Sequence, residues 1–269
     1  MSARCRLLRA CAVVACAAFG TAARADLTGT STAPSYTAAG VVSAATQMAQ
    51  TLAPNAIATL YGTNLSYNTQ AVTAADLEGG TLPTSVGGVT VSVNGIPANL
   101  FYVSPTQINF LIPYTITAAT AAIVVVRDGT AGPTVTVPLA ATAPAFFEWN
   151  GNLALAVDAS GNLISAASPA MPGEVIILFA EGLGRTQPDI QSGEVVSRAT
   201  PILALAGLQI LLNGTPVPPA SILYAGLAPG FSGLYQINLV LPAWLPPDPD
   251  IQIAIGTEIS PEGVELPAQ

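Results

Sequence analysis

The sequence predicts an all-β protein built from two β-sandwiches in tandem. A motif that places Gln-Ile-Asn before a short apolar run and a proline occurs at residues 107–113 and again at residues 236–242. Short apolar segments are separated by many of the 24 glycines and 23 prolines, and no stretch keeps a helical period. Because a repeated motif marks a duplicated module, the 269 residues are expected to form two domains.

The N-terminal residues have the order of a secretory signal peptide. Three arginines within residues 4–9 precede an apolar run over residues 10–19, and Ala23-Arg24-Ala25 follows as a cleavage site. We expect residues 1–25 to be removed after Ala25, because the apolar run is too short to span a membrane. Residues 13–16 also fit a lipoprotein signal, which would instead place a lipid on Cys16.

The composition of the exported chain excludes several kinds of function. All three cysteines lie within the signal peptide, and the sequence contains no lysine and no histidine, so thiol, Ser-His-Asp and Schiff-base chemistry and histidine-ligated metals are excluded. Three arginines remain beside fifteen carboxylates, a net charge of −12. A chain of this charge repels nucleic acid and anionic lipid, so neither is expected as a partner.

The first module is expected over residues 51–148. Residues 26–50 are rich in threonine, alanine and serine without an apolar period, which predicts a flexible leader. Strict alternation over residues 89–93 followed by Asn94-Gly95 predicts a hairpin. Apolar runs predict further strands over residues 57–65, 99–103, 107–112, 121–127 and 134–139.

The second module is expected over residues 149–269 with the same order of strands. Leu183 lies 118 residues after Leu65, the turn Asn213-Gly214 lies 119 after its counterpart, and the second Gln-Ile-Asn lies 129 after the first. The growing offset predicts insertions in the second copy at residues 218–219 and 227–233, which should be loops.

Two groups of segments resemble known families. Leu60–Leu65 and Leu178–Gly184, each followed by a strand with Asn-Gly, resemble the immunoglobulin-like plexin and transcription-factor (IPT/TIG) domain. Phe101–Phe110 and Tyr224–Asn238 are similar to the bacterial secreted-protein C-terminal family named from Solibacter-type bacteria. Over residues 52–269 the resemblance implies an exported pair of immunoglobulin-like sandwiches, and it assigns no catalytic residues.

Candidate contacts with a ligand or partner come from the repeated amides and from a group of aromatic residues. The amides could present hydrogen bonds to a glycan, or they could tie the backbone of the adjacent loop. The aromatic side chains could stack on sugar rings, or they could belong to the core. The residues concerned are Gln107, Asn109, Phe231, Tyr235, Gln236, Asn238 and Trp244, with Tyr224 in the same aromatic group.

One loop has the spacing of a calcium site. Asp158, Ser160 and Asn162 place oxygen side chains at alternate positions, as calcium loops do, although the same residues also favour a plain turn. Asp189, Asp248 and Asp250 could bind a cation by the same argument. No other cofactor is predicted.

The sequence favours an exported, non-catalytic structural, adhesive or assembly module that meets a protein or glycan at the cell surface or outside the cell. An alternative is a carbohydrate-binding or calcium-dependent recognition module that assists a separate enzyme. A third is a hydrolase that uses only carboxylates, which needs two facing acids. The acids nearest the module boundary are Glu148, Asp158, Glu174 and Glu181.

Overall fold

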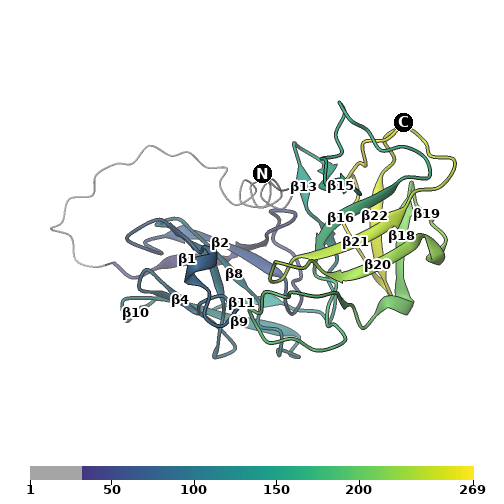
Figure 1. Ribbon diagram of the computed structural model, residues 1–269. Helices are drawn as coiled ribbons and strands as arrows, with labels where there is room; N and C mark the ends of the chain where they lie inside the picture. Colours follow the sequence, from purple (N-terminus) through teal and green to yellow (C-terminus); the bar gives the residue numbers. More distant parts are fainter. Residues whose placement is uncertain (1–31) are drawn as a thin grey trace.

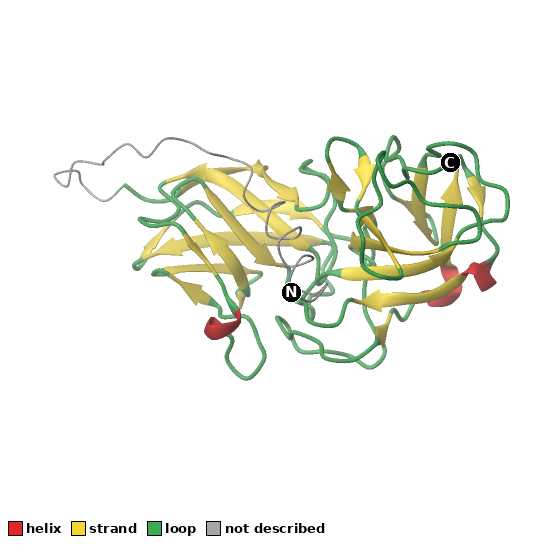
Figure 2. Cartoon of the chain, turned by 45° about the horizontal axis from the view of Figure 1, so that its top comes forward, coloured by secondary structure: helices red, strands yellow, loops and turns green. Residues whose placement is uncertain are grey.

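A computed structural model describes residues 32–269, so the predicted signal peptide, with Ala25 and Cys16, lies outside the described residues. The described chain forms two antiparallel β-sandwiches that pack against each other (Figures 1 and 2). Its helices are 3-10 turns: η1 (Ala74–Asp76), η2 (Leu205–Gly207) and η3 (Pro219–Ser221). The predicted all-β class and tandem sandwiches are confirmed.

The first sandwich consists of two sheets whose inward side chains form one core. The first sheet has the order β1 (Ser35–Ser43), β2 (Ile57–Thr63), β8 (Gln107–Leu111), β7 (Leu100–Val103) and β3 (Gln70–Ala71). The second sheet has the order β10 (Thr130–Ala131), β9 (Thr120–Arg127), β5 (Val89–Val93) and β4 (Ser85–Val86), with β11 (Val135–Pro138) beside β9 and β6 (Ile96–Pro97) beside β5. Alternation along β5 buries every second residue, the three valines, as the sequence predicts.

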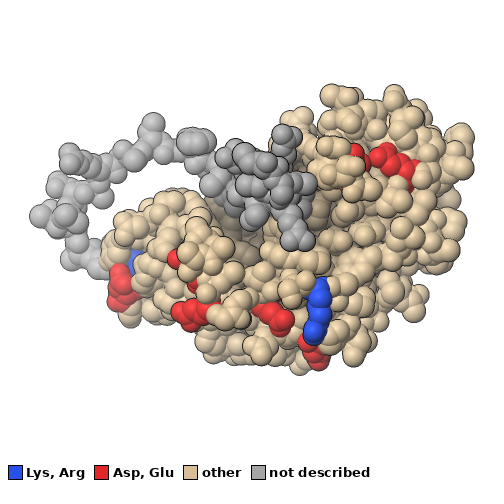
Figure 3. Space-filling view, viewed as in Figure 1, with Lys and Arg blue, Asp and Glu red and all other residues tan. Residues whose placement is uncertain are grey.

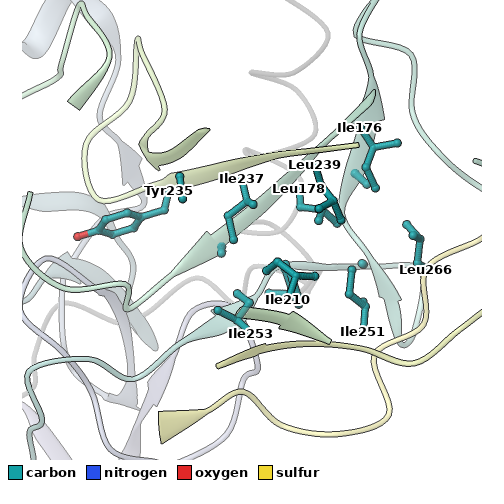
Figure 4. Packing of buried hydrophobic residues seen from close by; sticks show 14 of the residues in the cluster. Ile176, Leu178, Ile210, Tyr235, Ile237, Leu239, Ile251, Ile253 and Leu266 are labelled. Atoms are coloured by element: carbon teal, nitrogen blue, oxygen red, sulfur yellow. The ribbon is translucent and has the colours of Figure 1, made fainter. Parts of the chain in front are cut away.

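The second sandwich repeats this arrangement. One sheet has the order β12 (Ala145–Phe146), β16 (Val175–Glu181), β21 (Tyr235–Val240), β20 (Ile222–Leu227) and β17 (Thr200–Pro201), with β15 (Ala156–Asp158) also beside β16. The other has the order β19 (Thr215–Pro216), β18 (Leu208–Leu212), β22 (Ile251–Ile255) and β23 (Glu258–Ile259), and β13 (Glu148–Trp149) and β14 (Leu153–Ala154) form a separate hairpin. Figure 4 shows the isoleucines and leucines of β16 and β21 facing those of β18 and β22.

The duplication extends to the pairing register. Thr59 faces Asn109 in the first copy, and Ile177 faces Asn238 in the second, so both strands keep the offsets found in the sequence. Both predicted Asn-Gly turns also form, with positive φ at Asn94 (51°) and Asn213 (48°) as well as at the glycines that follow. These are the backbone angles of a two-residue hairpin turn whose twist matches the strands.

The expectation of a flexible leader over residues 26–50 is wrong for its second half, because Ser35–Ser43 is strand β1. This strand pairs with β2 at both of its ends, with a register shift between Tyr36 and Val41, so no regular alternation reveals it in the sequence. The Tyr36 hydroxyl donates to the carbonyl of Pro133 and accepts from the amide of Val125, which ties β1 to the opposite sheet.

The first strand of the second copy also begins earlier than the boundary expected near residue 148. Tyr36 faces Gly62 in the first copy as Phe146 faces Ala180 in the second. The single strand β1 therefore corresponds to β12 and β15 together, with the segment 147–155 inserted between them.

Candidate functional site

The repeated Gln-Ile-Asn segments have the same geometry in both copies. The central isoleucines, Ile108 and Ile237, are fully buried in the two cores, as alternation predicts. On the opposite face, Gln107 Nε2 donates to Asn109 Oδ1 (2.9 Å), and Gln236 donates to Asn238 in the same way (3.1 Å). The amides therefore bond to each other along the strand.

The alternative that these amides tie the adjacent loop is wrong for the first copy, where a serine does so instead. Ser104 Oγ accepts hydrogen bonds from the backbone amides of Thr106 and Gln107 and satisfies the turn before β8. Gln107 and Asn109 thus remain on the outer face of the sheet, where the second sandwich covers part of it.

The predicted insertion at residues 227–233 is the loop that covers this face. A Cβ atom on Gly233 would lie 2.3 Å from Leu111 Cδ1 and 3.1 Å from the carbonyl oxygen of Asn55, so a larger residue would have to displace the Leu111 side chain. Gly233 also has a φ of 69°, which favours glycine. The loop is fixed from its other side by Val196, whose backbone bonds to Gly230 and Phe231.

A cavity of about 150 Å³ lies where this loop meets the first sandwich. Two of the predicted contact residues, Asn109 and Phe231, line it together. The full lining is Ala44, Gln47, Ile57, Thr59, Phe101, Asn109, Phe147, Leu155, Phe231, Ser232 and Leu234. Neither Ser232 nor the meeting of two modules at this point is visible in the sequence, although the insertion in the second copy is a signal that could have indicated it.

Glu181 is a buried acid at the junction, which is the contact between the two sandwiches. It ends β16 in the second sandwich, and its Oε1 accepts hydrogen bonds from the Ser43 hydroxyl (2.5 Å) and the Ala45 amide (3.4 Å) of the first. Its Oε2 accepts one from the amide of Ile57 (3.2 Å). Burial raises the pKa of Glu181 to about 7, although these hydrogen bonds act in the opposite direction.

A second polar contact between the sandwiches lies in the loop after β16. Tyr114 of the first sandwich donates its hydroxyl proton to Asp189 Oδ1 (2.8 Å), and its backbone amide donates to Ser192 Oγ (2.9 Å). Arg185 pairs with the same aspartate at the surface. The hydrogen bond from Tyr114 and the bond from Arg185 both lower the pKa of Asp189. Asp189 is thus engaged by two side chains.

The remaining aromatic candidates have separate locations. Tyr235 is fully buried at the junction, where its hydroxyl donates to the carbonyl of Gly184 and accepts from Asn55 Nδ2. Tyr224 is half-buried and its hydroxyl bridges the backbone of Thr200 and Leu227. Trp244, in contrast, is 78% exposed in the loop after β21.

The segment with calcium-loop spacing forms a compact turn. Asp158 Oδ1 accepts the backbone amides of Ser160 and Asn162, and Oδ2 accepts the Asn162 side-chain amide (2.7 Å). The last of these bonds is the main cause of the lowered pKa of Asp158. These contacts correspond to the plain turn that the same residues allow, and calcium binding stays a prediction, as it does for Asp248 and Asp250.

The four acids considered for carboxylate catalysis have different environments. Glu174 Oε2 accepts the amide of Met171, Asp158 closes its turn, and Glu181 is buried in the junction. Glu148 lies on β13, where partial burial raises its pKa. Within residues 32–269 no group of three histidine, cysteine, aspartate or glutamate side chains could hold a metal ion. Figure 3 shows acidic side chains scattered over a mostly uncharged face.

None of the helices formed by residues 32–269 has the length and apolar character needed to cross a bilayer. No protein-family model matches the sequence, and no curated protein is similar to it at the significance required. The resemblance to the Solibacter-type family stays a prediction.

Solved structures similar to this chain include SGBP-B of a xyloglucan utilization locus in Bacteroides uniformis, with 12% identity over 88% of this chain and 50% of that one and a TM-score of 0.27. The surface glycan-binding protein PbSGBP-B of Prevotella bryantii has 11% identity over 81% and 37% of the two chains, with a TM-score of 0.27. The tandem Ig repeats of Dlar have 13% identity over 88% and 95%, with a TM-score of 0.21. This chain spans half or less of the two glycan-binding structures, and at these TM-scores the similarity carries no argument about function.

Proposed function

We propose that this chain is an exported, non-catalytic module that joins a protein or glycan partner at the bacterial cell surface or outside the cell. The observation that carries the proposal is the junction, where Glu181 and the loop around Gly233 hold the two sandwiches against each other. A fixed pair of sandwiches presents its surfaces at a constant spacing, as an adhesive or assembly module requires. The sequence has no histidine or lysine, and its three cysteines all lie within the predicted signal peptide, which supports a role without catalysis.

An attachment assay in the native host tests this function. We expect deletion of the chain to reduce attachment of the cells to their natural surface, and we expect the wild-type chain to restore it. A Gly233→Ala variant, which loosens the junction, should restore attachment poorly, whereas Gly230→Ala should restore it, because Gly230 has open space around its α-carbon. Unchanged attachment after deletion, together with no protein or glycan captured from envelope extracts, would contradict the proposal.

Carbohydrate binding is the second candidate, and the exposure of Trp244 favours it. A tryptophan that is 78% exposed offers an aromatic face on which a sugar ring can stack. A glycan array should then show binding by the wild-type protein and loss of binding by Trp244→Ala. Leu203→Ala is the matched control, since Leu203 is also an exposed apolar residue of the second sandwich. Equal binding by both variants would exclude Trp244 as the stacking residue.

A further inference from the structure

Each sandwich has a hydrophobic core of its own. The buried residues of the first core end at Leu139, and those of the second begin at Phe146. The chain crosses from one sandwich to the other once. The amide of Ala140 still bonds to the first sandwich and the amide of Ala143 already bonds to the second, so the crossing lies within residues 140–143. The sandwiches can therefore part by rotation within this short segment while both cores stay intact.

Glu181 belongs to the second sandwich, but the donors to its carboxylate come from the first. It is 1% exposed at the end of β16, and it accepts from the Ser43 hydroxyl and from the amides of Ala45 and Ile57. Glu181 forms no ion pair with any residue of the described chain. An ionised carboxylate at this place is therefore desolvated without a counter-charge, whereas the protonated carboxyl avoids most of this cost.

Thr63 shows the same position of the module without a covering sandwich. It occupies the place of Glu181 in the first copy, where it faces β1, and its side chain is exposed. Separation of the sandwiches would likewise return the carboxyl of Glu181 to water, in which it ionises at an ordinary pH. Closing the junction therefore takes up a proton at this group, and parting of the sandwiches releases the proton to the solvent.

The elements packed around Glu181 contain one other titratable group that acts on it. Segments 43–46 and 52–57 of the first sandwich, and β12 of the second, have no ionisable side chain. Tyr235 approaches Glu181 from β21, and burial raises the pKa of its hydroxyl, so it stays protonated near neutral pH.

The next charged side chains along the chain belong to the loop after β16. Arg185 pairs there with Asp189, which also accepts a hydrogen bond from Tyr114 of the first sandwich. These bonds lower the pKa of Asp189, so it stays ionised near neutral pH, as the guanidinium does. Of these groups, only Glu181 changes its charge in that range.

We propose that the junction is a hinge controlled by a proton: protonation of Glu181 holds the two sandwiches together, and loss of that proton lets them part. In the closed form the neutral carboxyl stays within the hydrogen bonds of the first sandwich. In the open form the outer face of the first sheet around Leu111 becomes accessible, together with the loop 227–233 that covers it. This device goes beyond the proposed function, since it requires no partner.

Thiol labelling measures this opening, because the exported protein from Asp26 onwards has no cysteine of its own. Leu111→Cys places a thiol on a fully buried position beneath Gly233 of the second sandwich. Leu60→Cys is the matched control, since Leu60 is equally buried but lies in the core of the first sandwich. Each rate of reaction with dithiodipyridine is divided by the rate of the same chain unfolded in urea at the same pH, which removes the effect of thiol ionisation.

We expect the corrected rate for Leu111→Cys to increase about 40-fold from pH 5 to pH 7, as linkage between a pKa of about 7 in the closed form and an ordinary value of 4.5 requires. Adding Glu181→Gln should abolish this dependence on pH. Leu60→Cys should react more slowly at every pH, because its exposure requires unfolding. Ala228→Cys, a second probe in the apolar cluster shared by the two sandwiches, should behave as Leu111→Cys does.

Two results would overturn the hinge. A corrected rate for Leu111→Cys that does not change with pH, or that changes equally in the presence of Glu181→Gln, would show that the proton on Glu181 does not control opening. Equal rates for Leu111→Cys and Leu60→Cys would show that the junction opens only when the first sandwich unfolds. None of these measurements involves a partner, so this inference and the proposed function can fail separately.

Discussion

The carboxylate of Glu181, at the end of β16, accepts a hydrogen bond from the hydroxyl of Ser43, at the end of β1, across the junction of the two sandwiches. The counterpart of Glu181 in the first copy is Thr63, since Ser35 faces Thr63 as Ala145 faces Glu181. Thr63 is exposed, whereas Glu181 is 1% exposed. The buried acid is therefore a feature of the junction and not of the repeated module.

Glu181 should make stability depend on pH. Its pKa of about 7 in the folded protein lies above the ordinary value of 4.5, so the folded state keeps a proton that the unfolded state loses. The contribution of Glu181 to the free energy of unfolding is fully present below about pH 4.5 and is lost as the pH rises through 7. The total loss is about 3 kcal/mol. Tyr235 is the titratable neighbour whose interaction with Glu181 is resolved, and its pKa is raised by burial, so it stays protonated in this range.

The variant Glu181→Gln isolates this effect. Urea unfolding at pH 5, 6, 7 and 8 should show that the variant gains stability relative to the wild type as the pH increases, because glutamine has no charge to desolvate. The difference between the two proteins cancels the contributions of the other carboxylates. A constant difference across this range would show that the pKa of Glu181 in the folded protein is not raised above its ordinary value.

Gly233→Ala should loosen the junction. The added Cβ would meet Leu111 and the backbone of Asn55, and the φ of 69° is unfavourable for alanine, so we expect a loss of about 3 kcal/mol. Gly230→Ala should cost about 1 kcal/mol, because its φ is also positive but no atom lies within 4 Å of the new Cβ. Chemical denaturation measures both, and small-angle scattering should show a larger radius for Gly233→Ala alone. Equal losses of stability in the two variants would mean that the contact of residue 233 with the first sandwich adds nothing to the cost of the substitution.

Arg127→Lys should destabilise the first sandwich by about 2 kcal/mol. Arg127 is 3% exposed, donates to the carbonyls of Asn64 (2.6 Å) and Thr32 (2.7 Å), and lies 4.0 Å from the centroid of the Tyr67 ring. Lysine cannot reach two carbonyls with one planar group or stack in the same way. Arg185→Lys is the control, because this pair with Asp189 is exposed to solvent and should leave stability nearly unchanged. Similar thermal unfolding of the two variants would contradict the structural role of Arg127.

The two Asn-Gly turns should respond alike to substitution. Asn94 Oδ1 accepts the amide of Ala122 (2.7 Å), and Asn213 Oδ1 accepts the amide of Asp250 (2.9 Å), so each asparagine joins its hairpin to the neighbouring strand. Alanine removes this bond and disfavours the positive φ, and each replacement should cost about 1–2 kcal/mol in thermal unfolding. A loss at only one turn would show that the copies differ at this position.

The sequence predicts the sandwiches well because the signals for their strands and turns come from residues that are neighbours in the sequence. Alternation in residues 89–93 and the Asn-Gly turn after it depend on neighbouring residues, and the repeat doubles that information. Strand β1 is missed because only Tyr36 and Val41–Ser43 are buried in it, with an irregular pairing between them.

The candidate site is predicted only in fragments. Asn109 and Phe231 are 122 residues apart, and their meeting depends on how the second sandwich docks on the first. The insertion at residues 227–233 can be found by aligning the copies, but the alignment alone predicts a loop and not the surface that it contacts. The environment of Glu181 is hidden for the same reason, since its partners belong to the other module.

The segment 147–155, which includes the hairpin β13–β14, makes the outer faces of the two modules different. Phe147 and Leu155 of this segment pack with Ile177 and Phe179 of β16, on the face that corresponds to Thr59 and Tyr61 in the first copy. That face contacts the second sandwich in the first copy, whereas in the second copy the segment covers it. Because Phe147 and Leu155 also line the junction with the first sandwich, the two copies meet through faces that are not equivalent.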